Sequence, residues 1–214
     1  MDDERRTSES DALLARAARL SHRSYQQLAP QEFGIRWLEN YVLSDAPLQE
    51  WWEQGLVRDL YPESRELRPD EHPFPARYAR RFTTMLVEPP TYLAAMERDV
   101  RLAGGRIVVR ELRSREEVQA LPEPAIINCT GLGAKALFGD DELEPVKGQL
   151  TFLLPQPEVD YIVISGGGLY MFPRRDGILL GGTFEHGVWS LDVNEEARQR
   201  ILAGHKALFE AMRG

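Results

Sequence analysis

Cysteine, lysine and long apolar runs are all scarce in this 214-residue sequence. Cys129 is the only cysteine, which excludes an internal disulfide, a paired-cysteine redox motif and a cysteine zinc site. The four histidines are scattered without an i, i+4 pair, so no metal site is predicted. The sequence also lacks a secretory leader pattern and any apolar run of about eighteen residues. We therefore expect a cytoplasmic protein without a membrane span.

Basic residues are outnumbered by acidic ones, 26 to 34, which gives a formal net charge of −8. Nucleic acids and anionic membranes both require a basic face on their partner, so the charge argues against either. A hydrophobic content of 43% is that of an ordinary globular protein, and the length suffices for one sizeable core or two small ones.

Apolar residues at helical spacing, together with capping residues, predict four helices, in addition to a helix of one or two turns after Gly131. The second begins at Pro89 and Pro90 and is expected to bury Leu93, Met96 and Val100. The predicted helices are Asp11 to Leu28 capped by Ser10, Pro89 to about Leu102, a short helix after the capping box Ser114-x-x-Glu117, and a final helix capped by Asp192.

Alternating or short apolar runs bounded by turn residues predict strands. They are Phe33 to Leu43, Arg77 to Val87, Arg106 to Leu112, Ala125 to Ile127, Gln149 to Leu154, Tyr161 to Ser165, Leu169 to Pro173, and Ile178 to Phe184. The last four are expected to form an antiparallel sheet with glycine turns. Residues 61–75 are predicted as loop, Arg80 and Arg81 as a solvated edge, and the tandem Trp51 and Trp52 as packing residues.

The stretch after Ile127 contains a glycine turn that organises the middle of the chain. Gly131-x-Gly133-x-x-Ala136 fits the dinucleotide pattern G-x-G-x-x-G/A. A dinucleotide unit also needs a long crossover helix and an acidic residue about twenty positions on, whereas Gly139 stops this helix after one or two turns. We therefore reject a dinucleotide fingerprint here. Cys129, beside the turn, is expected to be buried as a small apolar residue.

Several motifs in order and at matching spacing resemble the D-amino-acid oxidase family of FAD enzymes. They are Asn128-Cys129-Thr130-Gly131, Glu144-Pro145-x-x-Gly148-Gln149, Leu169-Tyr170-x-x-Pro173, Leu180-Gly181-Gly182-Thr183-Phe184, and Gly187-x-Trp189-Ser190. The resemblance implies a mixed α+β and α/β fold, with part of an FAD-binding domain joined to an antiparallel-sheet substrate domain. It assigns about 90–148 to the FAD domain, and about 31–88 and 149–190 to the substrate domain, within one FAD-dependent region spanning 1–214.

The resemblance also implies an activity and a set of site residues. Such enzymes use FAD and molecular oxygen to convert a D-amino acid to a 2-oxo acid, ammonia and hydrogen peroxide, without a catalytic base from the protein. Tyr170 matches the tyrosine that binds the substrate carboxylate, and Leu112, Thr130 and Gly131 match positions beside the flavin nucleotide. Gly166 replaces a second family tyrosine. Arg174 and Arg175 are expected to be solvent-exposed at a hairpin tip.

Two family motifs do not occur in this sequence: the opening G-x-G-x-x-G turn and the arginine-bearing G-F-R-P segment beyond the final helix. We therefore expect the sequence to correspond to the middle portion of such an enzyme and expect this chain alone to bind FAD poorly. A catalytically silent remnant or binding module without FAD is the alternative, and an unrelated α/β domain is a third possibility. Neither the particular D-amino acid nor the oligomeric state follows from the sequence.

Overall fold

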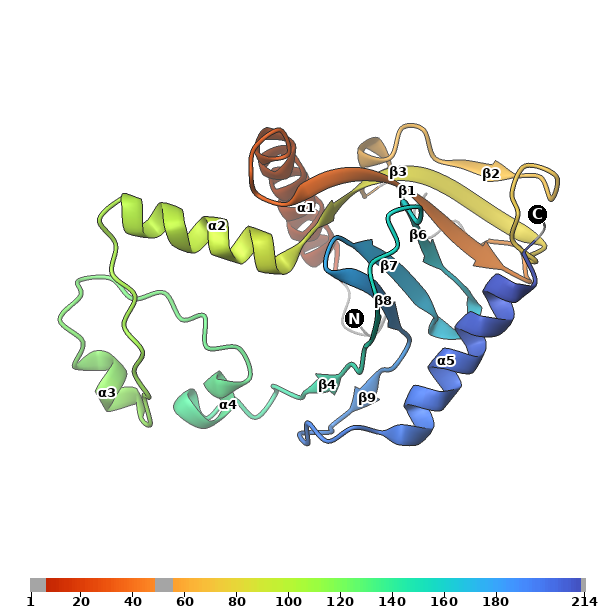
Figure 1. The fold of residues 1–214 in the computed structure, drawn as a ribbon. Coiled ribbons are helices and arrows are strands. Elements are labelled where there is room, and N and C mark those ends of the chain that lie inside the picture. Colours follow the sequence, from red (N-terminus) through yellow and green to blue (C-terminus); the bar gives the residue numbers. More distant parts are fainter. Residues whose placement is uncertain (1–6, 49–55, 213–214) are drawn as a thin grey trace.

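A seven-stranded sheet dominates the computed structural model, which describes residues 7–48 and 56–212. The strand order is β2-β3-β1-β6-β7-β8-β5 (Figure 1). The bounds are β1 Ile35–Ser44, β2 Arg65–Leu67, β3 Tyr78–Val87, β5 Thr151–Leu153, β6 Tyr161–Ile164, β7 Tyr170–Arg174 and β8 Gly177–Gly181. Neighbouring strands are antiparallel except for β1 and β6, which are parallel. The predicted antiparallel sheet is therefore confirmed, and it extends further than predicted because β1, β2 and β3 join it.

Two separate stretches of chain build this sheet, and a long insertion lies between them. Residues 35–87 supply three strands and residues 151–181 supply four. The two sets meet where β1 pairs in parallel with β6, from Glu39 opposite Tyr161 onward. Because side chains alternate across a strand, the sheet has two distinct faces. Leu43, Val163, Met171 and Ile201 belong to the core on one face, where Ile201 comes from the last helix, α5 (Glu195–Glu210). Figure 1 shows α5 lying along that side of the sheet.

The two long helices before residue 103 form at the predicted places. They are α1 (Ser8–Leu28) and α2 (Pro89–Leu102). The cap of α1 is Thr7 rather than Ser10; Ser10 completes the capping box by accepting the Thr7 amide N–H at 2.9 Å. Both helices pack through aromatic residues on Phe33 and Ile35, with Tyr25 from α1 and Tyr92 from α2.

The predicted inner face of α2 was wrong. Ala95 is the buried residue of this helix, whereas Leu93, Met96 and Val100 are exposed. Helical periodicity shows that an apolar stripe exists, but it does not show which neighbour will cover it. The buried side of α2 is the one on which Ala95 and Tyr92 pack with Phe33, 6.3 Å from Tyr92 between ring centroids.

Residues 61–75 are not simply a loop, because strand β2 lies within them and pairs with β3. This pairing covers the part of β3 that was predicted to be a solvated edge. Arg80 is buried there and forms an ion pair with Glu66 at 3.0 Å, so its prediction was wrong. Arg81 is partly exposed and pairs with Glu39 on β1. Trp51 and Trp52 lie outside the described residues.

The insertion between the two halves of the sheet is largely irregular. It contains α3 (Arg115–Gln119), α4 (Gly133–Phe138) and β4 (Val146–Lys147), which pairs with β9 (Glu185–His186). The strands predicted at Arg106 to Leu112 and Ala125 to Ile127 do not form, and Val109 and Ile127 are 99% and 87% exposed. An apolar run becomes a strand only when another strand hydrogen-bonds to it. No partner strand for these runs exists among the described residues.

Cys129, which follows the second of these runs, is exposed rather than buried. Among the described residues, no helix combines the length and the apolar character that crossing a bilayer requires.

Candidate functional site

Tyr170, the predicted substrate-binding residue, opens strand β7 directly opposite Gly181 on β8. A β-carbon placed on Gly181 would stand 2.1 Å from Cε2 and 2.2 Å from Cζ of the Tyr170 ring. The aromatic ring therefore lies against the bare backbone of β8, an approach that only glycine permits. Gly181 was quoted as part of a motif in the sequence but was not predicted to have this role.

The ring of Tyr170 is on the face of the sheet away from α5, because Met171, the next residue, packs in the core beneath that helix. On the Tyr170 face, Phe172 lies 5.5 Å away between ring centroids and packs on Leu38 and Ile162. Partial burial raises the pKa of the Tyr170 phenol. The hydroxyl therefore stays protonated at neutral pH and can donate a hydrogen bond to an anion.

Asn40 is a second polar residue on this face that sequence reasoning missed. It shares the orientation of Leu38 on β1, two residues away, and is buried. Its Nδ2 atom has no hydrogen-bond partner within the described part of the chain. The alternation of polar and apolar residues along β1 gave no signal for this burial, because it groups Asn40 with the polar positions opposite Tyr41 and Leu43.

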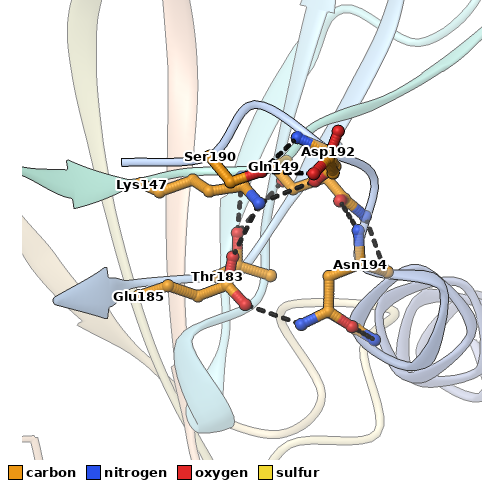
Figure 2. Close-up of polar contacts among 8 residues, drawn as sticks. Lys147, Gln149, Thr183, Glu185, Ser190, Asp192 and Asn194 are labelled. Carbon is orange, nitrogen blue, oxygen red and sulfur yellow. Dashed lines mark hydrogen bonds and ion pairs between the residues drawn. The ribbon is translucent and has the colours of Figure 1, made fainter. Parts of the chain in front are cut away.

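Gln149 lies just before β5 and Thr183 just after β8, and paired hydrogen bonds between them continue the contact of these two strands (Figure 2). The Gln149 amide N–H donates to Thr183 Oγ1 at 2.6 Å, and the hydroxyl donates to the Gln149 carbonyl at 3.3 Å. Thr183 is only 3% exposed, so water does not replace these bonds. The end of the strand that carries Gly181 is therefore fixed.

The side chain of Gln149 extends this network to the start of α5. Its Oε1 accepts the Asn194 amide N–H at 2.7 Å, and its Nε2 donates to the Asn194 carbonyl at 3.0 Å. Asn194 caps the helix through the amide of Ala197 and donates to Glu185 Oε1 at 2.6 Å. The prediction that Asp192 caps this helix was wrong. The Asp192 carboxylate instead accepts a hydrogen bond from the Ser190 hydroxyl at 2.6 Å.

Lys147 completes the group of residues in Figure 2. Its Nζ donates to the Asp192 carbonyl at 2.7 Å and lies 3.6 Å from Glu185 Oε2. The β4–β9 ribbon is thereby attached to the loop before α5. The network therefore joins β8, the strand paired with the Tyr170 strand, to β5 and to the start of α5.

The predicted cofactor residues lie in the insertion. Asn128 Oδ1 accepts both the amide and the hydroxyl of Thr130, at 3.1 and 2.7 Å, which fixes a tight turn before α4. Gly131 has φ +56°, and nothing lies within 4 Å of where its β-carbon would be. This open, glycine-containing turn fits the close approach of a nucleotide. Leu112 is half-buried in the extended run before α3.

The structure does not bring these residues to Tyr170. Figure 1 shows α3 and α4, which flank Leu112 and the Thr130 turn, well apart from the sheet. Four cavities of 330–540 Å³ in the described part of the chain are lined by other residues than Tyr170, Leu112, Thr130 and Gly131. The placement of these residues at one site therefore stays a prediction.

The two arginines of the β7–β8 turn differ from each other. Arg175 is exposed, as predicted. Arg174 is mostly buried, so its predicted exposure was wrong; its guanidinium pairs with Asp176 and lies over the Phe152 ring, 5.2 Å from the centroid.

Within the described residues, no group of three or more histidine, cysteine, aspartate or glutamate side chains has a metal-binding arrangement.

Comparison with known proteins places this chain in a family. The model of the DAO family, described as FAD dependent oxidoreductase, matches residues 3–214. A D-amino-acid oxidase of Rubrobacter xylanophilus is 32% identical over 187 residues, which are 85% of this chain and 55% of that protein. The human D-aspartate oxidase is 32% identical over 138 residues, 64% of this chain and 40% of that protein.

The chain thus spans about half the length of the relatives it matches. A crystal structure of glycine oxidase from Geobacillus kaustophilus has the same fold, with a TM-score of 0.65 over 95% of this chain and 64% of that one, at 17% identity. The fold predicted from the motifs is therefore confirmed, and the chain belongs to the DAO family of FAD-dependent oxidoreductases.

Proposed function

We propose that this chain forms the substrate-binding sheet and part of the cofactor region of an FAD-dependent oxidase of D-amino acids. One observation carries the proposal: the protonated phenol of Tyr170 lies on the floor made by Gly181, on the sheet face away from α5. The support from relatives is that a D-amino-acid oxidase and a D-aspartate oxidase are each 32% identical to this chain.

In this proposal, the Tyr170 hydroxyl donates to the substrate carboxylate, and Phe172 provides an apolar wall beside it. Leu112, Thr130 and Gly131 would hold the FAD nucleotide. Arg36 and Arg174 are not proposed as carboxylate partners, because Arg36 pairs with Glu88 at 3.0 Å and Arg174 pairs with Asp176. The protein's role is alignment and electrostatics rather than proton abstraction by a base.

The overall reaction balances with water and oxygen as co-reactants. The Cα–H bond breaks with its electron pair, a nitrogen-bound proton is lost, and the resulting imino acid is hydrolysed to a 2-oxo acid and ammonia. FAD, when bound, supplies the two-electron acceptor, and molecular oxygen becomes hydrogen peroxide. The chain itself would fix the carboxylate of the substrate so that Cα is presented in one orientation.

A catalytically silent module that does not hold FAD is the second candidate. The observation that favours it is the absence of pairing for the runs 106–112 and 125–127 within the described residues. An FAD domain without those strands would leave its cofactor turn unsupported.

Flavin retention and peroxide release separate the two candidates. We would purify the 214-residue chain with FAD, alone and mixed with the part of the Rubrobacter relative that lies outside the matched region. We expect little flavin on the chain alone, and bound flavin with peroxide release from one or more D-amino acids in the mixture. A mixture without bound flavin, or with flavin but no peroxide from any D-amino acid, would favour the silent module.

Substitution of Tyr170 then tests its role in that active mixture. Tyr170→Phe removes a hydrogen bond to a charged group, which is worth about 1.5–3 kcal/mol, or roughly one to two orders of magnitude in substrate binding. Tyr161→Phe is the matched control, because Tyr161 packs among Tyr41 and Phe74 on the opposite face. Equal substrate affinity in the two variants would remove Tyr170 from the site.

A further inference from the structure

A cavity of about 360 Å³ lies between α1, the sheet and the segment 59–63. Trp37 of β1 and Thr83 of β3 line it from the sheet. Because side chains alternate along a strand, Trp37 points to the same face as Tyr41, which packs on the core beneath α5, and so away from Tyr170. Sites for small molecules have volumes of about 300–1,000 Å³. The cavity therefore has the size of a small-molecule site, and its sheet residues are not those of the proposed oxidase site.

The indole of Trp37 is unusually open for its position in the sheet. Strand β1 has a neighbouring strand on each side, yet Trp37 is 44% exposed and lines the cavity. His22 of α1 meets the indole in a T-shaped contact, with 5.9 Å between ring centroids. Tyr61 is a second aromatic lining residue, and its ring lies 4.8 Å from that of Phe82. The faces of aromatic rings carry a negative potential and attract cations within about 6 Å, so these rings favour a positively charged ligand.

The charged side chains that line the cavity are Asp59 and Glu63, both acidic. Arg19 donates to the Asp59 carboxylate at 2.7 and 2.8 Å, and this pairing lowers the pKa of Asp59, so the carboxylate stays ionised. Glu63 is exposed and forms no ion pair with another residue in the described ranges 7–48 and 56–212. The cavity wall therefore carries one negative charge without a basic partner, in a chain whose net charge of −8 also attracts cations.

The aromatic lining and the charge together specify the ligand class. An anion would be repelled by the two carboxylates, and an uncharged molecule would gain nothing from Glu63. A cation with carbon substituents can place those substituents on the Trp37 ring and its charge near the Glu63 carboxylate. We propose that this cavity binds a small organic cation of the alkylammonium class, held against Trp37 and Tyr61 and balanced in charge by Glu63.

Two matched probes test this proposal on the 214-residue chain. Choline carries a trimethylammonium group, whereas 3,3-dimethyl-1-butanol has the same shape and hydroxyl with carbon in place of the charged nitrogen. An NMR titration should show saturable choline binding, with shifts at the Trp37 indole N–H and the Thr83 methyl group. The alcohol should bind roughly tenfold more weakly, because it lacks the attraction to the rings and the carboxylate. No saturable shift with choline, or equal affinity for the two probes, would overturn the proposal.

Variants locate the binding in the cavity. Trp37→Leu keeps an apolar side chain but removes the aromatic face, so it should abolish the preference for choline over the alcohol. Glu63→Gln should weaken choline binding severalfold and leave the alcohol unaffected. Glu32→Gln removes the same charge at an exposed position outside the cavity and should change neither.

If Trp37→Leu does not fold, the two probes on the unmodified chain and the pair of glutamate variants still decide. Unchanged choline preference in a folded Trp37→Leu variant, or equal losses in Glu63→Gln and Glu32→Gln, would contradict the assignment of the site.

Discussion

The ring of Tyr170 lies directly over the α-carbon of Gly181, its cross-strand partner on β8. The spacing is too short for any other residue at 181, because an added β-carbon would stand 2.1 Å from Tyr170 Cε2. The conformation of the proposed substrate-binding tyrosine is therefore determined by a glycine eleven positions away in the sequence.

Gly181→Ala should displace the tyrosine ring and destabilise the chain. Overpacking of this kind typically costs about 1–3 kcal/mol, which urea unfolding would measure. Gly166→Ala is the control, because nothing lies within 4 Å of its β-carbon position and its φ is not positive. Equal stabilities for the two variants would show that the ring does not lie on Gly181.

Thr183→Val tests the hydrogen bonds that join β8 to Gln149. The substitution keeps the side-chain shape but leaves the Gln149 amide without an acceptor in a buried place, at a cost of about 1–3 kcal/mol in the free energy of unfolding. Thr183→Ser keeps the hydroxyl and should lose much less. If the valine variant were as stable as the serine variant, the paired bonds in Figure 2 would not contribute to stability.

Asn194→Ala tests which residue caps α5. Loss of an N-cap side chain costs about 0.5–2 kcal/mol, and the bond to Glu185 would be lost as well. Asp192→Ala should change stability by less than about 0.5 kcal/mol, as surface substitutions usually do. A larger loss for Asp192→Ala would restore the cap predicted from the sequence.

Local signals in the sequence predicted the elements whose formation depends on nearby residues. The helix after Pro89 and the strands through Tyr170 and Ile178 formed because periodicity and turn glycines determine them within about twenty residues. Long-range partners were not predictable in the same way. Arg80 was placed at an edge because nothing near it in the sequence reveals that β2 would cover it.

The candidate site shows the same difference between local signals, which the sequence contains, and long-range contacts, which it does not reveal. Tyr170 was predicted from a motif, whereas the network of Gln149, Thr183 and Asn194 joins residues 34 and 45 positions apart and follows from the sheet topology alone. The strands predicted at 106–112 and 125–127 lacked a partner strand among the described residues, so apolar composition could not make them strands.

Val109→Ala and Val163→Ala form a matched pair that tests this exposure. Val109 is 99% exposed and Val163 is 1% exposed, although both lie in apolar runs of similar sequence. The first substitution should change the free energy of unfolding by less than about 0.5 kcal/mol, and the second should cost about 1.5–3 kcal/mol. A comparable loss at Val109 in the chain alone would mean that this run is packed in a strand.

The ion pair of Glu195 with Arg198 in the first turn of α5 predicts a dependence of stability on acid pH. The Arg198 guanidinium, with help from Gln199, lowers the pKa of Glu195 from 4.5 to about 2. Because the unfolded chain binds this proton more readily than the folded chain, the stabilisation is complete above the unfolded pKa and is lost as the pH falls toward the folded value. Urea unfolding between about pH 5 and about pH 3 should therefore show the stability difference between the unmodified chain and Glu195→Gln shrinking as the pH falls.

Glu196→Gln is the control for this prediction. It removes the same charge from the same helical turn and separates the effect of the Arg198 pair from that of the helix dipole. An equal pH dependence in both variants would assign the effect to the dipole and not to the pair.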